Sequence, residues 1–119
     1  MPIFHKNWEV IPGESLNFNI DYREGDHLDP DNLTPINLTN YSVVLKVTKR
    51  GATALELVEP YDIYVDKVAG HIEVSISPTN IALITDSQPV SYAVYIYNNY
   101  DVNDRYAILR GRIKVTTSA

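Results

Sequence analysis

The sequence predicts an all-β fold: an antiparallel immunoglobulin-like β-sandwich of seven or eight strands with one short helical turn. Three observations lead to this prediction. Apolar residues recur at every second position along most of the chain, which is the period of a half-buried strand. Turn-forming residues interrupt these runs about every 8–12 residues, as in two-sheet sandwiches. The last third, Val90 to Val115, holds two such runs around a polar segment, which is typical of a terminal β-hairpin.

Length and composition fit one small domain. A chain of 119 residues can bury roughly 65% of its unfolded surface around a single core. The absence of cysteine excludes a disulfide framework, a thiolate zinc site and a cysteine nucleophile. The N-terminus lacks the features of a secretory signal, and no run approaches the ~20 apolar residues of a membrane helix. We divide the chain into an N-terminal arm or short first strand, 1–13, and a β-sandwich domain, 14–119.

The first half of the chain is predicted to contain the longest loop between two strands. Apolar and polar residues alternate from Leu16 to Tyr22, which predicts a strand after the turn signal Pro12-Gly13. The segment Arg23 to Pro35 is rich in aspartate, asparagine and proline, so we expect a loop. The alternation returns from Tyr41 to Thr48 and predicts another strand. Its inward side chains are expected to be Val43, Leu45 and Val47.

Three more strands and a helical turn are predicted before the final hairpin. The strands are Thr53 to Val58, Ile63 to Asp66, and His71 to Ile76, and the last of these has the cleanest alternation in the chain. Ser77-Pro78 predicts a helix start, because serine caps free amides and proline suits the first helical position. The apolar side chains expected under the sandwich are those of Ile81, Leu83 and Ile84.

In the final hairpin the sequence predicts one inward and one outward set of residues. The inward set is Val90, Tyr92, Val94 and Ile96 on the first strand, and Ala107, Leu109, Ile113 and Val115 on the second. Gly111 falls in register with this set, where its missing side chain permits a close approach or a bulge. The outward set of the last strand is Ile108, Arg110, Arg112 and Lys114. Because the cysteine pair and core tryptophan of antibody domains are missing, a jelly roll or small barrel stays an alternative.

No arrangement of residues indicates catalysis, a metal or a cofactor. The acidic loop contains Asp26, Asp29, Asp31 and Asn32. Leu33 interrupts the ligand spacing of a calcium loop, so we expect these aspartates to cap their own turns and to bind no metal. The three histidines, His5, His27 and His71, are scattered and match no metal or catalytic motif. The sequence also lacks a nucleophile elbow and a phosphate loop, so we expect a protein that is not an enzyme.

Charge is spread unevenly along the chain, whose net charge is −5. The segment from Asp21 to Asp31 holds five acids against Arg23, and the chain from Arg105 onward holds four basic residues and no acid. One interpretation is two solvated faces. The other is a polar molecule whose acidic end meets a neighbour's basic end. The acidic balance and the single short basic strand argue against nucleic-acid binding, which usually needs a basic footprint.

Tyrosine is over-represented, with nine tyrosines against two phenylalanines. Tyr95 and Tyr97 fall on the opposite side of their strand from Tyr92, and Tyr100 lies at the turn. One interpretation is that tyrosine simply suits strands. The functional one is a flat partner-binding face, because tyrosine and arginine dominate protein–protein contacts. Its residues would be Tyr95, Tyr97, Arg110 and Arg112, with Tyr100 beside them. The same rings could stack on a sugar, as in a carbohydrate-binding module, and an accessory domain of a cell-surface protein is a third possibility.

The order of these segments resembles small immunoglobulin-like structural proteins of tailed-bacteriophage virions. The nearest group is the N-terminal domain of upper baseplate proteins, with similar tail- and capsid-associated proteins. The turn before a strand is Asn37-Leu38-Thr39-Asn40 here, where the family has aspartate first and glycine last. A short helical segment, Ser77 to Ile84, follows the central strand, and Leu109-Arg110-Gly111 lies in the closing strand. The resemblance covers about Glu14 to Val115.

The resemblance implies a non-enzymatic structural role in a phage particle. Such a protein would be an adaptor or decoration subunit on tail, baseplate or capsid, made in the host cytoplasm and located in the virion. Its partners would be other virion proteins and copies of itself in a symmetric assembly, without nucleic acid, membrane or cofactor. In the arm, Phe4 and Trp8 lie outside the sandwich pattern. They are either available for docking on a neighbour or close the end of the domain's own core.

Overall fold

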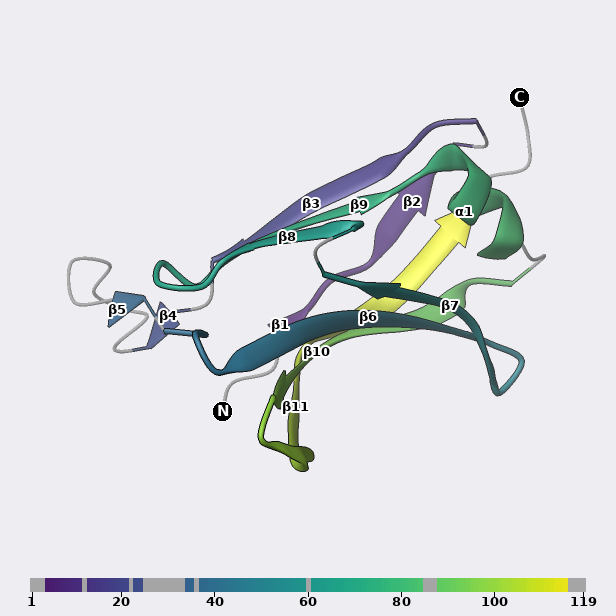
Figure 1. Cartoon of the computed structure of the whole chain (residues 1–119). Coiled ribbons are helices and arrows are strands. Elements are labelled where there is room, and N and C mark those ends of the chain that lie inside the picture. Colours follow the sequence, from purple (N-terminus) through teal and green to yellow (C-terminus); the bar gives the residue numbers. More distant parts are fainter. Residues whose placement is uncertain are drawn as a thin grey trace.

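Two β-sheets pack face to face, and Figure 1 draws them one above the other. The computed structural model describes residues 4–11, 13–21, 23–24, 34–35, 37–59, 61–84 and 88–115. The larger sheet contains β1 (Phe4–His5), β2 (Trp8–Val10), β6 (Tyr41–Lys49), β7 (Ala52–Val58), β10 (Val90–Asn98) and β11 (Asp101–Val115). The smaller sheet contains β3 (Leu16–Asp21), β8 (Ile63–Asp66) and β9 (His71–Ile76). One helix, α1 (Pro78–Ile84), follows β9.

The order of the strands identifies the fold. It is β1-β11-β10-β6-β7 in the larger sheet, with β2 also paired to β11, and β3-β9-β8 in the smaller sheet. An immunoglobulin domain places strands B, E and D in one sheet and strands C, F and G in the other. Here β3, β9 and β8 correspond to B, E and D, and β6, β10 and β11 correspond to C, F and G. The chain is therefore an immunoglobulin-like β-sandwich, as predicted. From Leu16 onward seven strands form the two layers. β1 and β2 both pair with β11 at the edge of the larger sheet.

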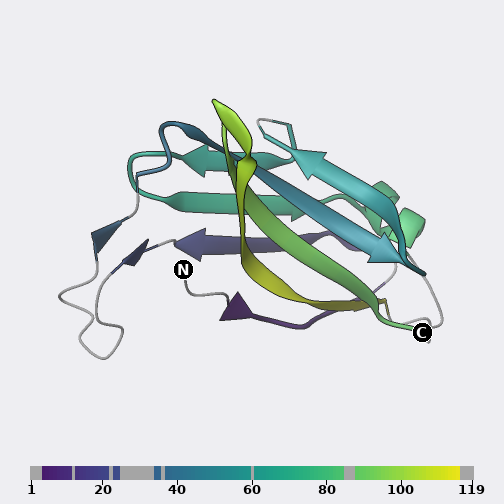
Figure 2. The same ribbon diagram turned by 90° about the horizontal axis from the view of Figure 1, so that it is seen from below.

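One feature of the larger sheet differs from the predicted antiparallel arrangement. β1 and β2 run parallel to β11, with Phe4 opposite Leu109 and Trp8 opposite Ile113. The other strand pairs of the two layers are antiparallel. Figure 2 shows this arm along the edge of the sheet. The period of two residues determines which side chains turn inward, but not the direction of a neighbouring strand, so the sequence pattern could not show the parallel pairing.

The core fills the space between the sheets. In β3 and β9 every second residue is buried, as the alternation predicts. The apolar residues that expose at most 1% of their surface are Leu38, Val43, Leu45, Val47, Ile63, Ile72, Ile76, Ile81, Ile84, Val94, Ile96, Ile108 and Ile113. Burying each such side chain contributes about 1.5–3 kcal/mol, which makes this cluster the main source of stability.

The helix forms where the sequence predicts it, with one exception in its buried side. The hydroxyl of Ser77 accepts a hydrogen bond from the backbone N–H of Asn80 at 3.2 Å and so caps the helix. Ile81 and Ile84 are buried, whereas Leu83 is 57% exposed, so the prediction that Leu83 lies under the sandwich is wrong. Residues three apart share a helix side, and Leu83 is two positions from Ile81 and therefore turns away from it.

A β-bulge corrects the predicted faces of the last strand. Val94 pairs with Leu109 but Tyr95 pairs with Ala107, so Ile108 is an extra residue between them. Such a residue shifts the phase of the alternation by one. Ile108 is therefore in the core rather than outward, and Ala107 shares the outward side with Tyr95. From Leu109 to Val115 the predicted faces hold.

The predicted loop from Arg23 to Pro35 begins and ends in a short antiparallel ribbon of β4 (Arg23–Glu24) and β5 (Thr34–Pro35). The residues between these strands lie outside the described residues, including Asp26, His27, Asp29, Asp31 and Asn32.

Lys67 connects the two layers. Its ammonium group contacts the Glu59 carboxylate at 3.2 Å and the carbonyl of Tyr41, and its own carbonyl accepts the N–H of Leu38 at 2.7 Å.

Candidate protein-interaction surface

The candidate site is the outer face of the larger sheet, the side turned away from the smaller sheet. Residues directly opposite each other on paired strands share a face, so the register gives its composition. One row crosses four strands without a charged residue. These residues, which we call the apolar row, are Val58 on β7, Val44 on β6, Tyr95 on β10 and Ala107 on β11.

The centre of the apolar row is covered by its own neighbours. Val44 is only 2% exposed, although the smaller sheet and α1 lie on the other side of β6 in Figure 1. Val58, at the β7 end, is exposed. The sequence prediction missed Val44. The signal was the uninterrupted apolar run Val43–Leu45, because a strand with one solvated face would have a polar residue in the middle.

Arginine and tyrosine meet beside the apolar row, but through a different arginine from those predicted. The guanidinium group of Arg105 lies over the ring of Tyr95 at 5.6 Å and over that of Tyr97 at 5.8 Å. Tyr97 and Arg105 are paired across β10 and β11, which places them in the next row. Such cation–π contacts contribute about 0.5–1 kcal/mol at exposed sites and hold the rings in place.

Arg110 and Arg112 lie on the other side of the apolar row. They pair with Ala93 and Ser91, and both are exposed. No ion pair between described residues involves either guanidinium group. The structure therefore places all four predicted residues, Tyr95, Tyr97, Arg110 and Arg112, on one face, with the apolar row between the Tyr97 row and the Arg110 row.

Tyr100 lies away from this face, at the tip of the β10–β11 hairpin, where it is 86% exposed. Its backbone N–H donates to the Asn98 side chain at 2.9 Å. Close to the tip, hydrogen bonds from Tyr106 above all, and from Asn98 and Tyr41, hold the pKa of Asp104 below its usual 3.8. The hairpin tip is thus a polar structure that presents one large ring to solvent.

The N-terminal arm packs onto the domain itself. The Trp8 ring stacks on Phe18 at 4.9 Å, and its Nε1–H donates to the Tyr92 hydroxyl at 2.7 Å. That hydroxyl donates in turn to the carbonyl of Lys6 at 2.6 Å. A side chain at Gly111 would place its Cβ 1.8 Å from the same carbonyl oxygen, so this glycine provides the close approach that the sequence suggested.

The two predicted docking residues of the arm differ in their surroundings. Trp8 is half-buried, an arrangement expected if it closes the domain's own core. Phe4 is 42% exposed and lines, with Trp8 and Phe18, an apolar cleft of about 350 Å³ between β1 and β3. Of the two predicted docking residues, Phe4 is therefore the one that leaves more of its apolar surface exposed.

The remaining candidate groups are dispersed over the surface. His5 pairs in register with Arg110 on the larger sheet, and His71 lies on the outer face of the smaller sheet. No group of three metal-ligating side chains occurs among the residues that the structure describes. Within the same residues, no helix is long and apolar enough to cross a bilayer.

Comparisons with known proteins find similarity among solved structures. No family model matches the chain, and no curated protein matches it. Among solved structures, the chain is similar to Drosophila OTK, extracellular domains 3–5, at a TM-score of 0.41 and 16% sequence identity. The match covers 96% of this chain and 33% of that chain, so the protein spans about a third of the length of its structural neighbour. The fold assignment rests on the strand order above.

Proposed function

We propose that the protein is a non-enzymatic structural subunit of a tailed-phage particle, an adaptor or decoration protein that binds its neighbours on tail, baseplate or capsid. The observation that carries the proposal is the outer face of the larger sheet. It combines an apolar row with Tyr97 and Arg105 on one side and Arg110 and Arg112 on the other. Aromatic residues and arginine around an apolar centre are the composition enriched in protein–protein interfaces.

Two further features of this face support a binding role. It lies on four hydrogen-bonded strands, so its side chains are held by a rigid sheet rather than by a loop. Arg105 already contacts both Tyr95 and Tyr97, so these side chains lose little conformational freedom on binding. The virion context comes from the sequence resemblance over Glu14 to Val115.

Carbohydrate binding through Tyr95, Tyr97 and Tyr100 has less support. A sugar stacks on an open aromatic face, but Arg105 lies over the rings of Tyr95 and Tyr97. Tyr100 is at the hairpin tip and does not extend the same platform. A glycan array is expected to give no signal. A signal that disappears in Tyr97→Ala would replace the structural proposal with this alternative.

The direct test is incorporation into particles. The variant Arg110→Glu/Arg112→Glu, supplied as the sole source of the protein during infection, is expected to lower its copy number in purified particles by about tenfold or more, because like-charge contacts replace complementary ones. Thermal unfolding of the isolated variant is expected to match wild type, since both arginines are exposed. The control, Lys49→Glu/Arg50→Glu, makes the same charge change at the β6–β7 turn. Normal incorporation of the Arg110/Arg112 variant would refute the assignment of this face.

A further inference from the structure

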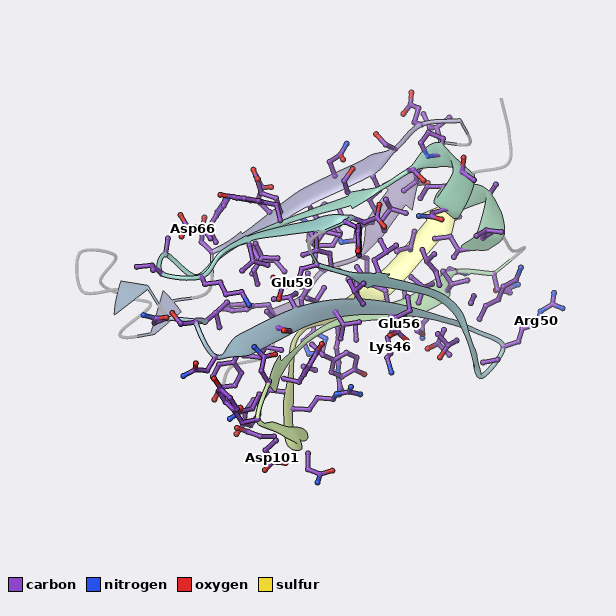
Figure 3. The ribbon with its side chains drawn as sticks, in the orientation of Figure 1. Lys46, Arg50, Glu56, Glu59, Asp66 and Asp101 are labelled. Atoms are coloured by element: carbon purple, nitrogen blue, oxygen red, sulfur yellow. The ribbon has the colours of Figure 1, made fainter. Side chains whose placement is uncertain are left out.

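The two outer faces of the sandwich carry opposite charge. From Arg105 to Val115 on β11, and on β2, β6, β7 and β10, the outward positions of the larger sheet hold five cations and two carboxylates: Lys46, Arg105, Arg110, Arg112 and Lys114, with Glu9 and Glu56. Two more carboxylates of β11, Asp101 and Asp104, lie towards the tip of the β10–β11 hairpin. The outward positions of the smaller sheet hold three carboxylates and no lysine or arginine: Asp21, Asp66 and Glu73. In Figure 3, Asp66 lies at the upper layer, and Lys46 and Glu56 lie at the lower one.

Neither face neutralises its own charge. Of the five cations only Lys46 has a carboxylate partner among the described residues, Glu56 at 3.9 Å. On the smaller sheet, Asp21 and Glu73 share a single histidine, His71, at 2.7 and 3.6 Å. The faces also cannot neutralise each other within one molecule. Two packed sheets alone are ~10 Å apart, which is about the distance over which physiological salt screens exposed charges.

We propose that copies of this chain associate head to tail, with the basic outer face of the larger sheet of one copy on the acidic outer face of the smaller sheet of the next. The inference rests on the proposed function and deepens it by naming the partner and both surfaces. Two basic faces repel each other, as do two acidic faces, so a two-fold dimer through either one is disfavoured. A head-to-tail contact repeats and gives a ring or a helical stack, and both suit a particle built from many copies.

The size of the smaller sheet sets the strength of each contact. Three strands of at most six residues present a flat area on the order of 300 Å² at ~4.8 Å between strands and ~3.3 Å per residue. A stable complex buries roughly 800 Å² on each partner. One contact is therefore weak, and the purified protein is expected to associate only at high concentration and low salt. Repetition in an assembly adds these contacts together.

The test uses two charge-reversed variants of the full chain. The first is Arg110→Glu/Arg112→Glu, which makes both outer faces acidic, and the second is Asp66→Lys/Glu73→Lys, which removes the acidic face. Sedimentation equilibrium at about 1 mM protein and 50 mM salt measures the association constant. Wild type is expected to associate, and to do so at least tenfold more weakly at 500 mM salt, because surface charges are then screened. Each variant alone is expected to be monomeric, and an equimolar mixture is expected to associate again, since acidic and basic faces then alternate.

Recovery in the mixture distinguishes the loss of a charged face from the loss of the fold. A misfolded variant could not regain association by mixing, and circular dichroism checks the fold of each. Wild type that stays monomeric at low salt, association that salt does not weaken, or a mixture that stays monomeric would each overturn the head-to-tail contact. These measurements use purified protein only. The proposed function fails separately, if the protein is missing from purified phage particles.

Discussion

The outer sides of the two sheets differ in their pattern of buried and exposed residues. In β3 and β9 of the smaller sheet, buried and exposed residues alternate, so the outer side is polar. In β6 and β10 of the larger sheet, three consecutive residues are buried, 43–45 and 92–94. The middle residues, Val44 and Ala93, belong to the outer side. The outer side of the larger sheet therefore contains apolar side chains that its own neighbours cover, whereas the outer side of the smaller sheet offers charge and hydrogen bonds.

The edges of the two sheets differ as well. β11 is covered along its outer edge by the parallel arm strands β1 and β2. β3 is the last strand of the smaller sheet, and among the described residues it pairs only with β9. The arm also provides Trp8, which stacks on Phe18 of β3 and so connects the edge of one sheet to the other. In antibody domains a disulfide and a tryptophan occupy the core between the sheets. Here a tryptophan from the arm closes that space at one edge.

The largest expected effect comes from adding a side chain at Gly111, where the arm lies against β11. In Gly111→Ala the new Cβ would lie 1.8 Å from the Lys6 carbonyl oxygen, a backbone atom that moves only if the arm moves. We expect a loss of roughly 2–4 kcal/mol in the free energy of unfolding, measured by urea denaturation.

The control for this prediction is Gly51→Ala. Gly51 has a φ of +82° but no atom within 4 Å of where a Cβ would lie, so alanine there causes backbone strain without a clash. Its cost should be about 1 kcal/mol. If Gly111→Ala costs no more than Gly51→Ala, the arm is not fixed against β11 as described.

The hydrogen bonds that fix the arm have a smaller expected effect. Burial raises the pKa of Tyr92, so its hydroxyl stays protonated and donates to the Lys6 carbonyl while accepting from Trp8. Tyr92→Phe leaves both partners unsatisfied and is expected to cost about 1–2 kcal/mol in unfolding free energy. Tyr97→Phe on the outer face is the control and should cost less than about 0.5 kcal/mol. Equal losses in the two variants would contradict the role of this hydroxyl.

A matched pair of substitutions on β6 compares the two sides of the larger sheet directly. Threonine has nearly the shape of valine but adds a hydroxyl. In Val43→Thr the hydroxyl would be in the core, at a cost of about 1–3 kcal/mol. In Val44→Thr it is on the side turned away from the smaller sheet, where only side chains of the same sheet cover it, so the cost should stay below about 1 kcal/mol. Equal losses in chemical denaturation would mean that the outer side is closed like a core, and it would then not serve as a contact surface.

The sequence predicted well what depends on local pattern. Strict alternation located β3 and β9, and serine followed by proline located the start of α1. Gly111 indicated a close approach, although not that the arm makes it. The prediction failed at Ile108, because a bulge adds one residue without any change in composition. It also missed the contacts of Arg105 with Tyr95 and Tyr97, which depend on how β10 and β11 pair beyond that bulge.

The smallest predicted effect concerns His71, the one group that changes the charge of the smaller sheet's outer face near neutral pH. A hydrogen bond to Asp21 at 2.7 Å and a weaker contact with Glu73 raise the pKa of His71 above its usual 6.5. The protonated form is therefore favoured in the folded state. The resulting stability is fully present below pH 6.5 and is lost as the pH rises through the folded-state pKa.

Comparison with His71→Gln measures this contribution. Wild type should exceed the variant by about 0.5 kcal/mol or less at about pH 5.5, as expected of a surface pair, and the difference should shrink by about pH 8. In an NMR titration, Asp21→Asn should lower the pKa of His71, because it removes the main cause of the shift. A stability difference that grows with pH would mean that the neutral imidazole is the favoured form. The smaller sheet would then keep its full negative charge at neutral pH. The difference in charge between the two outer faces would be larger than it is with a protonated His71.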